Sequence, residues 1–342
     1  MEKLFFDSDY MEGAIPEILK KLIVTNFEKT AGYGLDEYSE SAKRKIREAI
    51  GNPDADVYLL VGGTQSNATV IDSLLKSYEG VLACDSGHIA VHEAGAVEQS
   101  SHKVITIPNK SGKVDPADLK QYFELFEADA NHDHEVPVGA VYISHPTELG
   151  TLYTKQELKD LYEICQKNSA YLFLDGARLG YGLAAKTDVT LQDVAKYTDA
   201  FYIGGTKVGA LFGEAVVFKN RKICPKFFTL MKRHGALLAK GRILGIQFDT
   251  LFSDDNYMKY ARHAIALADK LEAGFRARNY QIAYESPTNQ KFILIENTKM
   301  EELKKKVSFS FWETYDKDHT VIRFVTSWAT REEDVDRLLE II

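Results

Sequence analysis

The sequence predicts an α/β fold: a large domain with a mostly parallel sheet flanked by helices, and a smaller α+β domain after it. Between Asp56 and Phe218, short apolar runs of strand length alternate with stretches of helical periodicity, the pattern of a parallel sheet. A long helical stretch over Asn256–Arg278 then leads into further strand-like runs. We therefore expect the large domain over residues 1–250 and the small C-terminal domain over residues 251–342.

The composition is that of a soluble enzyme. The chain has 342 residues, of which 45% are hydrophobic and 27% charged, and a net charge of -8 that argues against a nucleic-acid partner. No apolar run approaches the length of a membrane span, and the first residues reach Asp7 too early for a signal peptide. Cys84, Cys165 and Cys224 lie far apart, which indicates neither a disulfide framework nor a zinc site. A cytoplasmic protein is expected.

The individual elements follow from periodicity and from capping residues. Asp115 with Pro116 predicts a helix start, and Thr154 with Glu157 has the spacing of a capping box. Thr330 with Glu333 predicts a third cap, before the closing helix. Helices are expected over 12–29, 37–50, 65–78, 116–126, 155–168 and 224–234. Strands are expected over 56–61, 81–84, 103–107, 138–143, 171–174, 200–203, 215–218, 291–296, 307–312 and 321–325.

The first of these strands is followed by a candidate phosphate site. It ends at Gly62-Gly63-Thr64, where helical periodicity begins. The first amides of a helix are unpaired and its dipole favours negative charge, so this junction can bind an anion. We expect Gly63 and Thr64 to bind a cofactor phosphate. The alternative is a tight strand-to-helix turn in which Thr64 only caps the helix.

Two later strands each end at an ionisable residue. The run Tyr171–Leu174 meets Asp175, and the run Ala200–Ile203 leads through two glycines to Thr206 and Lys207. Open α/β sheets bind their ligands at the carboxyl ends of the strands. Pyridoxal phosphate (PLP) chemistry needs this pair, because a lysine forms a Schiff base with the cofactor while a carboxylate keeps its ring nitrogen protonated. In a partly desolvated pocket the lysine becomes a nucleophile. The alternative is a capping aspartate and a solvated lysine.

The residues around this pair resemble a known family. Asp175-Gly-Ala-Arg178 and Thr206-Lys207 are similar to the signature of the threonine aldolases and related β-eliminating lyases, PLP enzymes of the aspartate-aminotransferase fold type (fold type I). The resemblance extends from residue 7 to residue 323. It implies that Arg178 binds the phenolic oxygen of PLP or lies close to it, and that His88 stacks on the cofactor ring. Lys207, Asp175 and His88 are thus the expected catalytic residues.

The resemblance also assigns residues far from this signature. Arg323 is a cation within an apolar strand and needs an anionic partner, and it matches the arginine that binds the substrate carboxylate. Ser8 matches the serine that assists it, and we also place Tyr33 at the substrate site. Lys240 takes the place of a family arginine that reaches the cofactor phosphate, often from the neighbouring subunit, with Arg242 two residues further on. The alternatives are an edge-strand Arg323 that faces water and a solvated helix end at 240–242.

The chain departs from the family at one position. The family usually carries a second active-site histidine in a Thr-His step, whereas this chain has Thr147-Glu148 with His145 displaced. The catalytic base and the preferred diastereomer are therefore not predicted. His88 and His92 have helical spacing, but no third ligand stands at a standard distance, so no metal is expected.

Together these residues predict a lyase that uses PLP to cleave a β-hydroxy-α-amino acid of the threonine or allo-threonine type into glycine and an aldehyde. One alternative is PLP-dependent β-elimination from a cysteine-like or tyrosine-like substrate. Another is a nucleotide-binding or metal-dependent α/β protein that uses Gly62-Gly63-Thr64 as its phosphate site. The resemblance also implies a homodimer or homotetramer with the active site at the subunit interface. From the net charge and the apolar runs, neither a nucleic-acid nor a membrane partner is expected.

Overall fold

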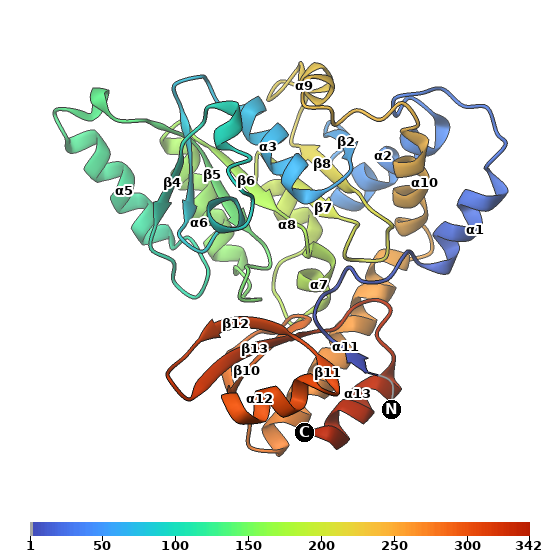
Figure 1. The fold of residues 1–342 in the computed structure, drawn as a ribbon. Coiled ribbons are helices and arrows are strands. Elements are labelled where there is room, and N and C mark those ends of the chain that lie inside the picture. Colours follow the sequence, from blue (N-terminus) through green and yellow to red (C-terminus); the bar gives the residue numbers. More distant parts are fainter. Residues whose placement is uncertain (1–2) are drawn as a thin grey trace.

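The computed structural model describes residues 3–342 and shows a large sheet with its helices above a smaller, antiparallel sheet (Figure 1). The large sheet has seven strands, and all but β8 run in the same direction. Its strands are, in spatial order, β2 (Asp56–Leu60), β8 (Glu214–Phe218), β7 (Ala200–Gly204), β6 (Tyr171–Asp175), β5 (Val138–Ser144), β3 (Gly80–Cys84) and β4 (Val104–Ile107). The predicted mostly parallel sheet is confirmed.

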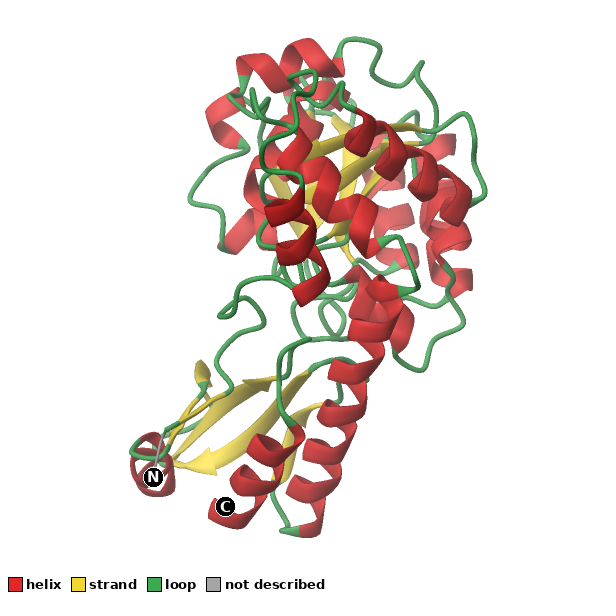
Figure 2. Ribbon diagram, turned by 90° about the vertical axis from the view of Figure 1, so that its right-hand side faces the viewer, coloured by secondary structure: helices red, strands yellow, loops and turns green. Residues whose placement is uncertain are grey.

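Helices cover both faces of this sheet (Figure 2), which explains why its central strands are apolar throughout rather than alternating. In β6, for example, Leu172 and Leu174 pack into one apolar cluster and Phe173 into the other, across the sheet. The helices before residue 256 are α1 (Pro16–Val24), α2 (Glu37–Ile50), α3 (Gly63–Leu74), α4 (His88–Val91), α5 (Pro116–Ala128), α6 (Lys155–Lys167), α7 (Leu179–Ala184), α8 (Leu191–Lys196), α9 (Phe227–Arg233) and α10 (Arg242–Leu251). Among residues 3–342, no helix has the length and apolar character that crossing a membrane requires.

Two of the three predicted helix caps are confirmed. Asp115 accepts hydrogen bonds from the first backbone amides of α5, and Thr154 and Glu157 form the reciprocal capping box of α6. The third prediction is wrong, since no side chain caps α13 (Glu332–Ile341). The Thr330 hydroxyl instead accepts a hydrogen bond from the Ser327 N–H at 2.8 Å, within the turn that precedes the helix.

The smaller sheet is antiparallel, in the order β12 (Ser310–Thr314), β13 (His319–Val325), β10 (Gln290–Glu296) and β9 (Gln281–Tyr284). It packs with the long helix α11 (Asn256–Ala277), with α12 (Asn297–Lys304) and with α13. The predicted strand 307–312 is split, because β11 (Val307–Ser308) pairs with β1 (Leu4–Phe5) and only β12 pairs with β13. The N-terminal segment therefore lies beside the small sheet. The domain boundary at residue 250 stays a prediction.

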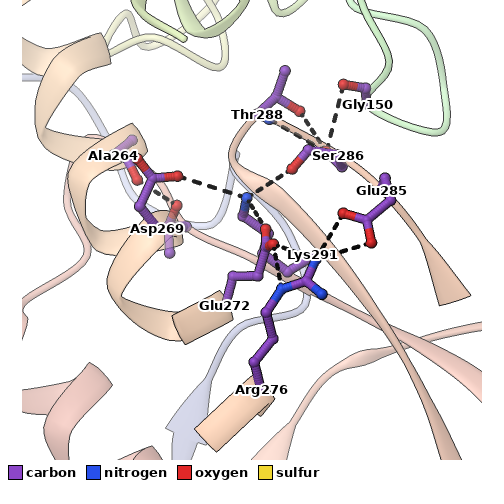
Figure 3. Close-up of polar contacts among 10 residues, drawn as sticks. Gly150, Ala264, Asp269, Glu272, Arg276, Glu285, Ser286, Thr288 and Lys291 are labelled. Atoms are coloured by element: carbon purple, nitrogen blue, oxygen red, sulfur yellow. Dashed lines mark hydrogen bonds and ion pairs between the residues drawn. The ribbon is translucent and has the colours of Figure 1, made fainter. Parts of the chain in front are cut away.

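A buried lysine holds the small sheet to α11. Lys291 on β10 is 3% exposed, and its Nζ donates to Glu272 Oε2 and to the Ser286 carbonyl, both at 2.7 Å (Figure 3). The Ser286 hydroxyl in turn donates to the backbone oxygen of Gly150, which lies in the loop after β5. The loop between β9 and β10 is thus hydrogen-bonded to a loop at the carboxyl edge of the large sheet.

Candidate active site

A cavity of about 220 Å³ lies at the carboxyl edge of the large sheet. It is formed by the segments that follow β2, β3, β5, β6 and β7, as expected for a parallel sheet. The structure brings seven of the predicted site residues together in its lining: Gly63, Thr64, His88, Asp175, Arg178, Thr206 and Lys207.

Asp175 ends β6, lines the cavity and accepts four hydrogen bonds. Its Oδ2 accepts from the Tyr142 hydroxyl at 2.6 Å and from Asn67 Nδ2 at 3.0 Å. Its Oδ1 accepts from the Tyr202 hydroxyl at 2.5 Å and from the Ala177 N–H at 2.9 Å. A carboxylate has about four acceptor positions, so this one is held rigidly in its ionised form.

Burial and charge set the ionisation of the central pair. Burial alone would raise the pKa of Asp175, but the charge of His88 and the tyrosine hydroxyls lower it below its ordinary value. The pKa of Lys207 is lowered because burial and the neighbouring Arg178 disfavour the ammonium form, against the attraction of Asp9 and Asp175. The cavity thus holds a stable anion beside an amine that is easily deprotonated.

His88 begins the short helix α4 and is paired with a buried acid. Its Nδ1 lies 2.7 Å from Oε1 of Glu93, and Asn67 donates to the same oxygen at 2.7 Å. Burial lowers the pKa of His88, but the bond to Glu93 and the charge of Asp175 outweigh it, so the pKa is raised. The imidazolium form is therefore favoured.

Glu148, which stands near the point where the resemblance implies a second histidine, also lines the cavity. Its Oε1 accepts from the Ser144 hydroxyl at 2.6 Å and from the backbone N–H of His88 at 3.1 Å. Its Oε2 is buried and has no partner among the described residues. Burial raises the pKa of Glu148, against the opposing effect of Ser144.

Sequence reasoning missed two acids of the cavity, Glu93 and Glu214, of which Glu214 stands at the start of β8. Thr206, predicted to bind the cofactor, donates its hydroxyl to Glu214 Oε1 at 2.8 Å, and Gly205 N–H donates to Oε2 at 3.3 Å. Burial raises the pKa of Glu214 to about 8. The sequence signal was an acid directly before the apolar run 215–218, where a strand buried on both faces has no solvent to receive a charge.

Arg323 lies on β13, an inner strand of the small sheet, so the alternative of an edge strand facing water is wrong. Its guanidinium donates to Gln290 Oε1 at 2.8 Å and to the Ser310 hydroxyl at 3.2 Å. Its Nε and the hydroxyl of Ser8 are buried without a partner in the described chain. Burial lowers the pKa of Arg323 to about 10, and Arg178 adds to this effect. These groups can take up an anion.

Four predicted site residues are not among those that line this cavity: Ser8, Arg323, Lys240 and Tyr33. Lys240 is exposed and precedes α10, and Tyr33 is 43% exposed and lines a separate cavity of about 150 Å³. Arg242, the second candidate cation, is committed elsewhere, since its guanidinium donates to the carbonyls of Thr25 and Glu28. Within residues 3–342, no group of three or more His, Cys, Asp or Glu side chains could hold a metal ion.

Comparison with known proteins decides the family. The model of the β-eliminating lyases matches residues 6–298. The chain belongs to the β-eliminating lyase family. This lyase is 41% identical to a threonine aldolase from Leishmania major, with 99% of this chain and 98% of the other covered and a TM-score of 0.95.

A more distant relative and a solved structure of similar fold extend this result. A low-specificity L-threonine aldolase from a Pseudomonas species is 29% identical over 97% of this chain and 95% of the relative. An aspartate aminotransferase from Thermus thermophilus shares the fold, with a TM-score of 0.71 at 14% identity over 99% of this chain and 91% of the other. The predicted fold type of the lyase is therefore confirmed.

The residues of this lyase fit the expected cofactor. PLP needs an amine, an anion for its ring nitrogen and a site for its phosphate, and Lys207, Asp175 and the first turn of α3 supply all three. At Gly63 an added Cβ would lie 3.1 Å from the Tyr202 hydroxyl that bonds Asp175, so glycine allows this close approach.

Proposed function

We propose that this lyase cleaves a β-hydroxy-α-amino acid of the threonine type into glycine and an aldehyde, with PLP as its cofactor. The observation that carries the proposal is the amine of Lys207, with its lowered pKa, in the same cavity as the hydrogen-bonded anion of Asp175. The two relatives named as threonine aldolases, which cover nearly the whole chain, support aldol cleavage over β-elimination.

The chain divides the binding of the cofactor among its strand ends. Bound PLP would act as an electron sink for the bond that is cleaved. Lys207 would hold the cofactor, Asp175 would keep its ring nitrogen protonated, and His88 would contact the ring. Gly63, Thr64 and Thr206 would bind the phosphate, and Arg178 the phenolic oxygen.

The substrate is oriented by its carboxylate. Arg323 and Ser8 present buried polar atoms without partners, and an α-carboxylate would satisfy both. A substrate held in this way can place the bond between its α and β carbons for cleavage, because orientation relative to the cofactor decides which bond breaks.

We further propose that two subunits complete each site. Lys240 and Tyr33 are exposed and lie outside the cavity of their own chain, so they can serve the cavity of a partner. The test is to mix the inactive Lys207→Ala and Lys240→Ala proteins under conditions of subunit exchange. Hybrids that contain one intact site should recover activity, whereas no recovery would contradict a shared site.

We also propose a cytoplasmic location. The three cysteines are all free and buried, which supports it.

The visible absorption spectrum tests the cofactor and the site together. Protein incubated with PLP and then freed of excess should absorb visible light, and glycine should change that absorption, since glycine is the expected product. A protein that stays colourless after PLP is supplied would contradict the proposal and favour a nucleotide-binding function. Release of pyruvate and ammonia from a cysteine-like or tyrosine-like substrate, in place of glycine and an aldehyde from threonine, would favour β-elimination.

A further inference from the structure

We propose that Glu148 is the catalytic base that removes the proton from the β-hydroxyl group of the substrate. This inference rests on the proposed function and names the group that the family pattern leaves unassigned in this chain. The structure gives Glu148 one carboxylate oxygen that is anchored and one that is available.

The anchoring is provided by two donors. The Ser144 hydroxyl and the His88 N–H both bond Oε1, which holds the carboxylate against the wall of the cavity. Oε2 is buried and lacks a partner among the described residues. A buried acceptor without a partner is unfavourable, so a hydroxyl that donates to Oε2 relieves this cost as it binds.

The other acids of the cavity and its histidine already have assigned partners. Asp175 accepts four hydrogen bonds and is assigned to the ring nitrogen of the cofactor, and Glu214 accepts a hydrogen bond at each oxygen. Glu93 also has one oxygen without a partner, but its charge is balanced by His88 at 2.7 Å. His88 itself favours the imidazolium form, which has no lone pair to accept a proton.

The basicity of Glu148 suits the task. Burial raises the pKa of Glu148 above its ordinary value of 4.5, with Asp175 adding to the effect and the Ser144 hydrogen bond opposing it. A carboxylate with a raised pKa is a stronger base, and a base works best when its pKa lies near the operating pH.

The step balances without any further reactant. Oε2 of Glu148 takes the hydroxyl proton while the electron pair of that O–H bond forms the carbonyl bond of the aldehyde. The bond between the α and β carbons breaks, and its electron pair stays with the α carbon. One proton added to the α carbon gives glycine, and one proton leaves Glu148 to solvent, so there is no net gain or loss of protons.

The test compares two substitutions in the holoenzyme. Glu148→Gln keeps a carbonyl oxygen that can accept from Ser144 and His88, but it removes the base. Glu148→His introduces the residue that the family carries at this position. We expect the kcat for L-threonine cleavage to fall about 10²–10⁴-fold in Glu148→Gln and to recover at least tenfold of that loss in Glu148→His, given the usual contribution of a general base.

A second reaction separates catalysis from folding. Exchange of an α-hydrogen of glycine with deuterated water involves no β-hydroxyl, so it should stay within about threefold of wild type in Glu148→Gln. Equal losses of cleavage and exchange, or cleavage by Glu148→Gln at near wild-type rate, would overturn the assignment. If the wild-type protein releases no glycine from L-threonine, the proposed function itself fails, which is a different result.

The pH dependence gives an independent readout. In wild type, kcat/KM should fall on the acid side as Glu148 is protonated, with a midpoint above 4.5. This limb should move in Glu148→His toward the ordinary imidazole value of about 6.5 and be absent in Glu148→Gln.

Infrared spectroscopy of the protein without cofactor follows the same carboxyl group directly. In the difference spectrum of wild type minus Glu148→Gln, the band of a protonated carboxyl group should appear over the same pH range. A difference spectrum without this band would contradict the assignment.

Discussion

Arg178 and Asp9 form a bidentate ion pair, in which Nε donates to Oδ2 at 2.7 Å and Nη2 donates to Oδ1 at 3.0 Å. Asp9 is fully buried, and its partner stands three residues after Asp175, so the pair joins the N-terminal segment to the cavity. Burial alone would raise the pKa of Asp9, but Arg178 and Lys207 hold it below the ordinary value. The N-terminal segment is therefore part of the electrostatic environment of the reactive lysine.

Substitution of Asp9 by Asn should destabilise the protein, because Arg178 would keep its buried charge without a counter-ion. We expect the free energy of unfolding in urea to fall by about 3–5 kcal/mol at pH 7. Since the folded-state pKa of Asp9 is depressed, the difference from wild type should be complete above the unfolded value of 3.8 and should shrink as the pH falls through the lower folded value. Glu301→Gln, which breaks the exposed pair with Lys304, is the control and should change stability by less than about 1 kcal/mol.

Substitution of Arg323 by Ala should raise the KM for L-threonine more than it lowers kcat, because the guanidinium binds the carboxylate in both ground and transition states. The loss of one charge-assisted pair predicts an increase of roughly tenfold to a hundredfold. Arg323→Lys keeps the charge but not the planar guanidinium, so its KM should lie between those of the wild type and Arg323→Ala. Steady-state kinetics checks both variants. An unchanged KM with a large loss of kcat would argue against a carboxylate site here.

Removal of the Tyr142 hydroxyl should weaken the hold of the protein on PLP. Tyr142→Phe deletes one of the donors that lower the pKa of Asp175, so this carboxylate becomes less firmly ionised. We expect the Kd for PLP, measured by titration of the cofactor-free protein, to rise roughly tenfold. Tyr153→Phe is the matched control, since this buried hydroxyl accepts from the Val114 N–H and makes no hydrogen bond to Asp175. An equal rise in both variants would mean that the effect is not specific to Asp175.

Gly150→Ala should disturb the loop that carries Glu148. An added Cβ would stand 2.1 Å from the Ser286 hydroxyl and 2.7 Å from that of Thr288, in a backbone with φ of +74°. Gly235→Ala is the matched control, because its φ is +66° and nothing lies within 4 Å of the added Cβ. The control should lose only about 1–2 kcal/mol of stability, which is the cost of a residue with a Cβ in this backbone conformation. Gly150→Ala should lose more stability and also lower kcat, and equal effects on stability and kcat would contradict a role for the contact with Ser286.

Much of the fold could be predicted from the sequence, because the strands of the large sheet are buried on both faces and appear as continuous apolar runs. The seven strands of this sheet were all expected, and the predicted bounds 37–50 of α2 agree with the structure. Short elements without strong periodicity, such as α8 and β9, were not expected. The cap expected from Thr330 failed because the same hydroxyl serves a local turn.

The site was predictable where a chemical group ends a strand, and not where it depends on strand order. Asp175 and Lys207 follow apolar runs and could be read directly from the sequence. Tyr142 and Tyr202 reach Asp175 because β5 and β7 flank β6, and periodicity does not reveal which strands are neighbours. The contact between Glu148 and His88 joins residues 60 positions apart and likewise depends on the tertiary fold.

The most direct test of the account is to quantify the products that the purified protein forms from L-threonine in the presence of PLP. The account predicts glycine and acetaldehyde in equal amounts, and no formation of either by Lys207→Ala. Formation of a 2-keto acid and ammonia would contradict the assigned reaction. Cleavage by Lys207→Ala at a rate close to wild type would contradict the role of Lys207.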